Sequence, residues 1–331
     1  MSVDVRIEGD SLYVNPRSRD VQPGEGLTSW LQRVFYLPTG FVARLFDEQR
    51  VIVGHHVGHK QDLMRPGQGF HLTGDIVVNP GVLSAPEWAP DIVSLFEDEH
   101  LLVVDKPSGL LIHGEAGRDP DTLDARVAAH YEKQGVQRRV LHAHRLDKCT
   151  SGLVLYAKHA YSGRTLDTLI RQKQVSRTYL ALVHGRPIQA TGTIDTAIGR
   201  DRHMAGRYRV HVGGKPAFTH YNTLGTARVG NQRWSLLKCR LDTGRTHQIR
   251  VHLASIGCPV VGDNLYGAGN ESGTDPQLFG LPKWEGHALH AWRLEWYHPY
   301  AGRSMEVVSA PSGIFSQWLS FLKLAALVQK D

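Results

Sequence analysis

The chain of 331 residues has few cysteines and no long apolar run, and each shortage excludes a class of protein. Its cysteines, Cys149, Cys239 and Cys258, lie far apart without a Cys-x-x-Cys pair, which argues against a disulfide scaffold and a thiolate zinc site. No stretch reaches the roughly 18 consecutive apolar residues of a transmembrane helix. The N-terminus also lacks the apolar core of a signal peptide. We therefore expect a cytoplasmic protein with reduced thiols and no membrane partner.

Acidic residues are in deficit as well. Asp and Glu number 32 against 38 Lys and Arg, which gives a formal charge of +6. A basic balance suits a polyanionic partner, although net charge informs association rather than fold. Hydrophobic residues make up 41% of the chain, enough for a sizeable core. At roughly 150 residues per domain, the length predicts two domains.

The most informative segment is 144–152, with the sequence His-Arg-Leu-Asp-Lys-Cys-Thr-Ser-Gly. Arg145 and Lys148 stand close to Asp147, and nearby positive charge favours the ionised form of a carboxyl group. The apolar run 153–157 follows at once and predicts a buried strand. An ionised carboxylate at the end of a strand is a candidate nucleophile. A lone Asp in a loop more often caps a turn, so this segment needs support from the rest of the chain.

That support comes from five further segments, which together with 144–152 resemble the motifs of the RluA-type pseudouridine synthases in the family's order. The resemblance runs from about residue 92 to about residue 310. One match would be weak evidence, whereas six in order are strong. Cys149 is a departure, because the family often has an acidic residue at that position, which is not the nucleophile. The other segments are 99–113 with Lys106 and Pro107 at its centre, 177–185, 243–253, 262–267 and 287–296.

The resemblance implies an RNA pseudouridine synthase, an isomerase that detaches uracil from ribose, turns it over and rejoins it through carbon. It implies no metal, nucleotide or redox cofactor. Asp147 would be the catalytic carboxylate, acting by attack on the sugar carbon or by removing the 2′ proton to give a glycal. Arg250 would pair with it, and Tyr179 would stack on the base or take the proton from its C5. Leu289 would form an apolar wall of the pocket, and Arg145 would contact the substrate.

A second basic region, 199–215, resembles the basic hairpin loop of the family. It holds five basic residues and one acid, with Tyr208 among them, and suits phosphate contacts and stacking on RNA. Arg171, Lys173 and Arg177 form another basic run. Taken alone, either run would suit a solvated face equally well. The substrate-binding residues predicted in this loop are Arg200, Arg202, Arg207, Arg209 and Lys215.

Residues 24–80 are predicted to form a small separate unit. Apolar positions from Leu27 onward follow i, i+3, i+4, i+7, i+8 spacing and predict a helix, and 41–46 predict a second one. Residues 51–57 suggest a hairpin. This order resembles a diverged S4-type RNA-binding domain, with Gly69 where that family usually has Asp; the alternative is a generic helical cap. The predicted boundaries are an S4-like domain over 1–83, a linker over 84–94 and a catalytic domain over 95–331.

The larger part mixes strand-like runs with helices. We predict an α+β fold with a mixed, mainly antiparallel sheet, flanking helices and a central cleft. In the helix that carries Arg250, the apolar face is formed by Ile249, Leu253 and Ile256, so Arg250 can face a cleft. The C-terminal run 314–328 predicts one amphipathic helix packed on the body. The predicted strands lie at 101–104, 153–157, 179–183, 234–241 and 288–296.

The expected partner is RNA, and the expected protein is a monomer with no obligate protein partner. The S4-like unit favours large-subunit ribosomal RNA over transfer RNA as the substrate. Two alternatives stay open: a synthase-like fold that binds RNA without turnover, and a hydrolase that uses Asp147 with Asp242 as a carboxylate pair. A metal site is not expected, since neither His142 with His144 nor the cluster at 55–59 has partners at metal-ligand spacing.

Overall fold

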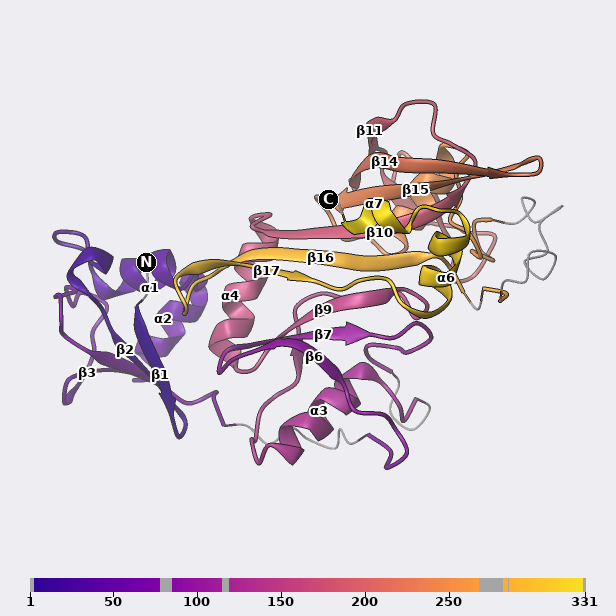
Figure 1. The fold of residues 1–331 in the computed structure, drawn as a ribbon. Helices are drawn as coiled ribbons and strands as arrows, with labels where there is room; N and C mark the ends of the chain where they lie inside the picture. The colour runs from indigo at the N-terminus through magenta and orange to yellow at the C-terminus, as the bar shows by residue number, and fades with distance from the viewer. Residues whose placement is uncertain (1–2, 78–84, 115–118, 268–281, 285, 330–331) are drawn as a thin grey trace.

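The computed structural model describes residues 3–77, 85–114, 119–267, 282–284 and 286–329, which form two parts that lie side by side (Figure 1). The N-terminal part is a five-stranded antiparallel sheet with two helices packed against it. The helices are α1 (Leu27–Val34) and α2 (Thr39–Asp47), preceded by a short 3-10 turn at Ser18–Asp20. In sheet order, the strands are β1 (Asp4–Glu8), β2 (Ser11–Asn15), β5 (Phe70–Thr73), β3 (Val51–Val53) and β4 (His56–Val57).

The amphipathic pattern explains why this part folds as it does. Trp30 and Leu31 of α1 and Leu45 of α2 are fully buried against strands β2, β3 and β5. The predicted helices and the 51–57 hairpin are confirmed. The β1–β2 hairpin was not predicted, because every residue of β1 is at least partly exposed and charged residues separate its apolar ones.

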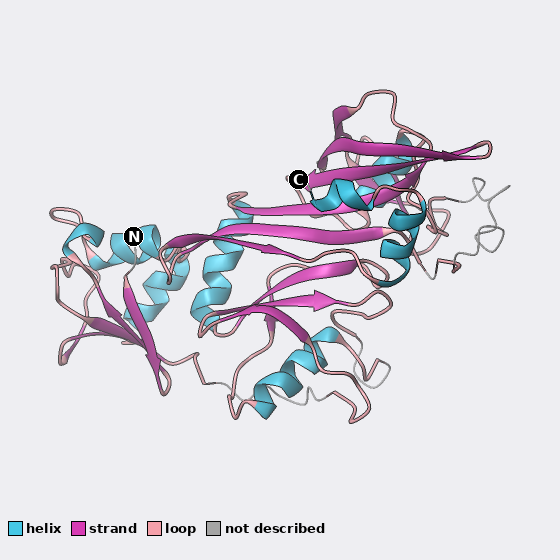
Figure 2. Ribbon diagram, in the orientation of Figure 1, coloured by secondary structure: helices cyan, strands magenta, loops and turns pink. Residues whose placement is uncertain are grey.

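The larger part is built on one ten-stranded sheet, which runs through the middle of the molecule (Figure 2). All its strand pairs are antiparallel except β9 with β16, so the predicted mixed, mainly antiparallel α+β fold is confirmed. The path runs β11 (Thr191–Asp195), β14 (Phe218–Val229), β15 (Gln232–Leu241), β10 (Val175–His184), β16 (Leu289–His298), β9 (Ser151–Ala157), β7 (Leu101–Lys106) and β6 (Val93–Glu97). Two further strands, β17 (Arg303–Val308) and β8 (Leu141–His142), pair with β16 and β9.

Strand β6 begins inside the segment predicted as a linker, since Val93 already pairs with Asp105 of β7. The central strands β7 and β9 are buried on both faces, which is why they read as continuous apolar runs. A separate two-stranded ladder, β12 (Ile198–Arg200) with β13 (Tyr208–Val210), lies within the predicted basic loop. The helices of this part are α3 (Leu123–Lys133), α4 (Ala160–Arg171), α5 (Gln248–Ser255), α6 (Gly313–Phe321) and α7 (Ala325–Gln329).

The C-terminal run packs on the body as predicted, with Phe315, Trp318 and Leu319 in the main core. It forms two short helices rather than one, because Lys323 adopts a left-handed conformation with φ of 58° and ends the first. Across the stretches of chain described above, no helix combines the length and apolarity that crossing a bilayer demands.

The N-terminal part is fastened to the body through α4, which lies at the junction of the two parts in Figure 1. The Tyr161 hydroxyl donates to the carbonyl of Thr73 at 2.8 Å, and Thr165 Oγ1 donates to the carbonyl of Phe35 at 2.6 Å. The rings of Phe35 and Tyr300 lie 4.8 Å apart, and both are buried. The polar and aromatic contacts act together, so they fix the orientation of the two parts.

Candidate active site

Asp147 lies in the turn between β8 and β9, where two backbone features hold the loop. The backbone N–H of Thr150 donates to the carbonyl of Asp147 at 3.0 Å and closes the turn. Gly152 has φ of +102°, and a Cβ atom there would lie 2.2 Å from the carbonyl oxygen of Ala291. Only glycine fits this position, because any side chain would strain the backbone and force β9 away from β16. The glycine thereby fixes the loop against the sheet.

Lys106 holds the same loop through hydrogen bonds from its side chain to backbone carbonyls. Its side chain is fully buried, and Nζ donates to the carbonyls of Pro107 at 2.9 Å and of Leu110 and Lys148 at 2.8 Å. Burial lowers the pKa of Lys106 to about 7, because desolvation disfavours the ammonium form; the charges of nearby acidic groups oppose this shift. Lys106 was singled out in the sequence only as the centre of a motif. In the fold it ties the turn after β7 to the residue next to Asp147.

Arg250 makes the predicted contact with Asp147. Its Nη1 donates to Asp147 Oδ2 at 2.9 Å, while Nε and Nη2 donate to Asp263 at 2.7 and 2.9 Å. Burial alone would lower the pKa of Arg250, but the hydrogen bonds and charges of Asp263 and then Asp147 raise it above its usual value. Burial likewise works to raise the pKa of Asp263, and Arg250 outweighs it, so the pKa is lowered. Arg250 is therefore a fixed cation shared by two carboxylates.

Asp263 was missed as a site residue, although its segment 262–267 was recognised. Nothing in that segment alone shows that its acid lies beside an arginine 13 residues earlier. Asp263 is almost fully buried, and its Oδ1 also accepts from the backbone N–H of Leu265 at 3.0 Å. The carboxylate is thus immobilised on both sides, and it aims the guanidinium group of Arg250 at Asp147.

His247 is a second residue that the sequence analysis did not assign to the site. It precedes α5 in the left-handed region with φ of 56°, which is uncommon for a residue other than glycine. Its Nε2 lies 3.9 Å from Asp147 Oδ2, and its Nδ1 lies 2.8 Å from the hydroxyl of Tyr266. Burial lowers the pKa of His247, which favours the neutral ring. The Tyr266 hydroxyl can donate to Nδ1, and in that arrangement the neutral ring carries its proton on Nε2, which faces Asp147.

Tyr179 and Leu289 project from the same face of the sheet. Leu289 on β16 is paired with Ala181, which stands two residues after Tyr179 on β10. Both side chains are buried and line the same hollow as Asp147. Burial raises the pKa of Tyr179, and Asp147 contributes to the increase, so the phenol keeps its proton at neutral pH. The structure therefore brings together five predicted site residues around one hollow, namely Arg145, Asp147, Tyr179, Arg250 and Leu289.

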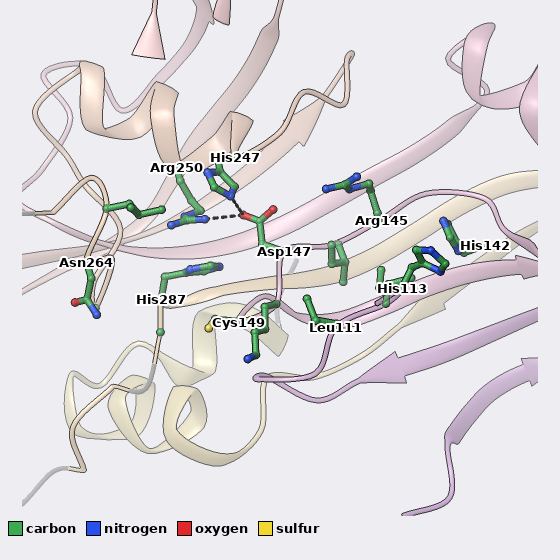
Figure 3. A pocket seen from close by; sticks show the side chains of 16 residues that line it. Leu111, His113, His142, Arg145, Asp147, Cys149, His247, Arg250, Asn264 and His287 are labelled. Carbon is green, nitrogen blue, oxygen red and sulfur yellow. Dashed lines mark hydrogen bonds and ion pairs between the residues drawn. The ribbon is translucent and has the colours of Figure 1, made fainter. Parts of the chain in front are cut away.

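Two hollows meet at Asp147, with volumes of about 500 and 420 Å³. Arg145, Asp147, His247 and Arg250 line both of them. Figure 3 shows Asp147 between Arg250 and His247 on one side and Arg145 on the other. The side chain of Asp147 is 22% exposed, so its carboxylate is open to the cleft while Arg250 is buried. The exposed Arg145 is free to contact a molecule that enters.

The basic hairpin β12–β13 lies against this site. The backbone N–H of Tyr208 donates to the hydroxyl of Tyr266 at 3.0 Å, and the guanidinium of Arg207 lies 5.8 Å from the Tyr266 ring. Arg250 lies 5.1 Å from the same ring, so Tyr266 joins the hairpin to the site. A hydrogen bond from Arg200 lowers the pKa of the Tyr208 hydroxyl. The remaining predicted residues of this loop, Arg202, Arg209 and Lys215, are exposed.

The carboxylate pair of the hydrolase alternative is not formed. Asp242 binds Lys173 at 3.2 Å and His220 at 3.2 Å, and it lines neither of the two hollows at Asp147. Within the described ranges, no group of three or more His, Cys, Asp or Glu side chains is placed to hold a metal ion.

Three comparisons identify the family. Residues 100–255 match the family model described as RNA pseudouridylate synthase. The chain is 35% identical over 278 residues to the uncharacterized RNA pseudouridine synthase YhcT of Bacillus subtilis, covering 84% of this chain and 87% of that one. It is 34% identical to ribosomal large subunit pseudouridine synthase D of Escherichia coli, over 78% of each chain. The structure of human RNA pseudouridylate synthase domain containing 4 superimposes with a TM-score of 0.57 at 25% identity, covering 70% of this chain and 92% of that one. The chain belongs to the RluA-type family of RNA pseudouridine synthases, enzymes that isomerise uridine in RNA.

Proposed function

We propose that Asp147 is the catalytic carboxylate of this synthase. The observation that carries the proposal is the 2.9 Å contact from Arg250 Nη1 to an Asp147 carboxylate that remains open to the cleft. A charge-assisted hydrogen bond holds and aims the carboxylate while leaving its other oxygen free. Both routes, attack on the sugar carbon and removal of the 2′ proton, need that free ionised oxygen.

Tyr179 and Leu289 are proposed to hold the uracil ring once it has left the RNA stack. Extracting a base costs a few kcal/mol, which contacts in the pocket and to the phosphate backbone must offset. The phenol of Tyr179 and the apolar side chain of Leu289 offer a stacking surface next to Asp147. Because the raised pKa of Tyr179 keeps its proton in place, we assign it base stacking in preference to removal of the C5 proton.

The proposed substrate is a uridine in structured large-subunit ribosomal RNA. The name of the Escherichia coli relative supports this class, as do the exposed arginines and lysine of the β12–β13 hairpin. We further propose that residues 1–83 are a diverged S4-like RNA-binding domain. The order of the elements along the chain, two helices followed by a hairpin, supports this proposal. A transfer-RNA uridine is the alternative substrate, and the proposed cellular site is the cytoplasm.

The test uses RNA carrying tritium at C5 of uridine. A synthase releases that tritium to water when carbon C5 is rejoined to ribose, and it leaves the RNA intact with no free uracil. Release of free uracil would assign a hydrolase instead, and binding without either product would assign an RNA-binding protein without turnover. Pseudouridine mapping of total RNA from cells with and without the gene then distinguishes ribosomal from transfer RNA.

A further inference from the structure

A third hollow, of about 490 Å³, lies where the two parts of the molecule meet. On one side it is lined by Pro38, Phe41 and Arg44 at α2, and on the other by residues of α4. Ala143 and Ile170 line both this hollow and the 420 Å³ hollow that contains Asp147. The hollow at the N-terminal part therefore adjoins the active-site cleft at Ala143 and Ile170. The lining from α4 is Arg164, Asp167, Ile170 and Arg171.

This adjoining hollow carries an excess of positive charge. Arg44, Arg164 and Arg171 are exposed, against the single acid Asp167. Arg171 donates to the carbonyl of Asp167 at 3.2 Å and to Thr168 Oγ1 at 3.5 Å, neither of which neutralises its charge. Arg164 lies 3.7 Å from Asp167 in an exposed pair, which holds the arginine only weakly. Among the ion pairs of the described residues, none involves Arg44 or Arg171.

The guanidinium groups are arranged by contacts from both parts. Arg44 of α2 and Arg164 of α4 lie over the ring of Phe41, at 5.5 and 5.7 Å from its centre. Arg164 and Arg171 are seven residues apart, so they share one face of α4 and are separated by about 10 Å along its axis. Since Phe41 is covered by two cations, the groove presents charge rather than an aromatic surface for base stacking.

The orientation of this groove is set by polar contacts between the two parts, one of them at the start of α4. Arg50 donates to the Tyr161 hydroxyl at 3.0 Å and pairs with Asp75 at 2.8 Å, and Arg138 donates to the carbonyl of Ile76 at 3.0 Å. The bond from Arg50 to Tyr161 joins the N-terminal part to the start of α4, and the bond from Arg138 to Ile76 joins it to the chain after α3. The three arginines consequently keep a set position relative to Asp147.

We propose that this groove, formed by Arg44, Arg164 and Arg171, binds the phosphate backbone of the RNA strand that flanks the target uridine. The inference rests on the proposed function. The N-terminal part and the catalytic part would then bind one continuous strand. The enzyme would therefore contact a longer stretch of RNA than its catalytic cleft alone can contact. Arginine binds phosphate through paired N–H groups, and contacts to the backbone hold RNA without reading its sequence.

The test compares the triple variant R44E/R164E/R171E with the control R6E/R228E/R233E. The control residues are exposed arginines on β1 and on the β14–β15 hairpin, outside the groove, and the change in net charge is the same. The probes are oligouridylates of about 15 and about five nucleotides, with affinity measured over a range of salt. Thermal unfolding of both variants checks that the fold is retained.

For the long probe, we expect the groove variant to bind at least about tenfold more weakly, with a salt slope smaller by about 2, or roughly 0.7 for each lost contact. The short probe should bind both variants within about threefold of each other, because it occupies the Asp147 cleft. If both triple variants weaken binding of the long probe equally, or if the groove variant binds it unchanged, the proposal that this groove binds RNA is wrong. Tritium release by the wild-type protein is measured separately, so failure of the proposed function is seen even where the groove binds RNA.

Discussion

Arg250 binds Asp263 through the Nε–Nη2 edge of its guanidinium group and donates from Nη1 to Asp147 Oδ2 at 2.9 Å. The two carboxylates that bind Arg250 therefore have different roles. Asp263 is buried and neutralises the cation, while Asp147 is open to the cleft. An arginine fully occupied by Asp147 would leave that carboxylate less able to react, because both its oxygens would accept hydrogen bonds.

Asp263→Asn tests this arrangement. The amide cannot balance the charge of Arg250, whose guanidinium group should then turn toward Asp147 and misplace it. We expect kcat to fall by about 10²-fold with little change in KM, because a small displacement of a catalytic group in an active site has an effect of about this size. Loss of one partner of a buried ion pair should also lower the free energy of unfolding by about 3 kcal/mol or more. Steady-state kinetics and urea unfolding measure the two effects, and a drop in stability with unchanged kcat would leave Asp263 a purely structural residue.

Asp147→Asn tests the catalytic assignment directly. The side chain keeps its shape, but an amide can neither attack the sugar nor accept its proton. Turnover should fall by about 10³-fold or more. RNA affinity should stay within about threefold of the wild-type value, because phosphate contacts supply most of it. The control is Asp242→Asn, which removes a carboxylate from a residue that lines neither hollow at Asp147. Pseudouridine formation by the Asp147 variant at a rate comparable with the control would refute the assignment.

The sequence predicted those parts of the site that are written in contiguous segments. The loop that carries Asp147 is a local structure, set by its turn and by Gly152, and the strand after it is a plain apolar run. The helix that carries Arg250 has its apolar face on neighbouring residues. Its contact with Asp147 was expected from a family resemblance, since the two residues are 103 positions apart.

The remaining features depend on contacts between distant segments. Tyr266 touches His247, Arg250 and the β12–β13 hairpin, which come from separate segments of the chain. The left-handed backbone at His247 has no glycine or asparagine to indicate it. Likewise, Tyr161 is an ordinary helix residue in sequence, and only the folded chain shows that it anchors the N-terminal part. Tertiary contacts of this kind leave no local pattern to read.

The arginines of the basic hairpin have two different roles, because some are placed to bind RNA and Arg207 supports the active site through Tyr266. Arg202 and Arg209 are exposed, so R202A/R209A should weaken RNA binding and reduce the salt slope by about 1.4, for two phosphate contacts to single-stranded RNA. Arg207→Ala should in addition lower kcat, because Arg207 lies over the Tyr266 ring that also supports Arg250. The matched control is R228A/R233A on the β14–β15 hairpin. Identical binding and salt dependence for R202A/R209A and the control would place the RNA contacts elsewhere.

Three buried histidines should make the free energy of unfolding depend on pH. Desolvation lowers the pKa of His100 and His144 to about 3 and that of His287 to about 4, from an ordinary value of 6.5. Below pH 6.5 the unfolded chain therefore binds protons that the folded protein excludes. The free energy of unfolding should fall as the pH drops from about 6.5 toward 4, by up to about 1.4 kcal/mol per pH unit for each histidine.

His144→Gln isolates one of these three contributions. Glutamine can still accept the hydrogen bond that the backbone N–H of Leu155 donates to His144 Nε2 at 3.3 Å, but it takes up no proton. Urea unfolding between about pH 7.5 and pH 5 should show a pH slope smaller than that of the wild type by up to about 1.4 kcal/mol per unit. His203→Gln is the control, because it removes an exposed histidine without removing a buried imidazole. If both variants keep the wild-type slope, His144 accepts its proton in the folded protein and burial does not hold it neutral.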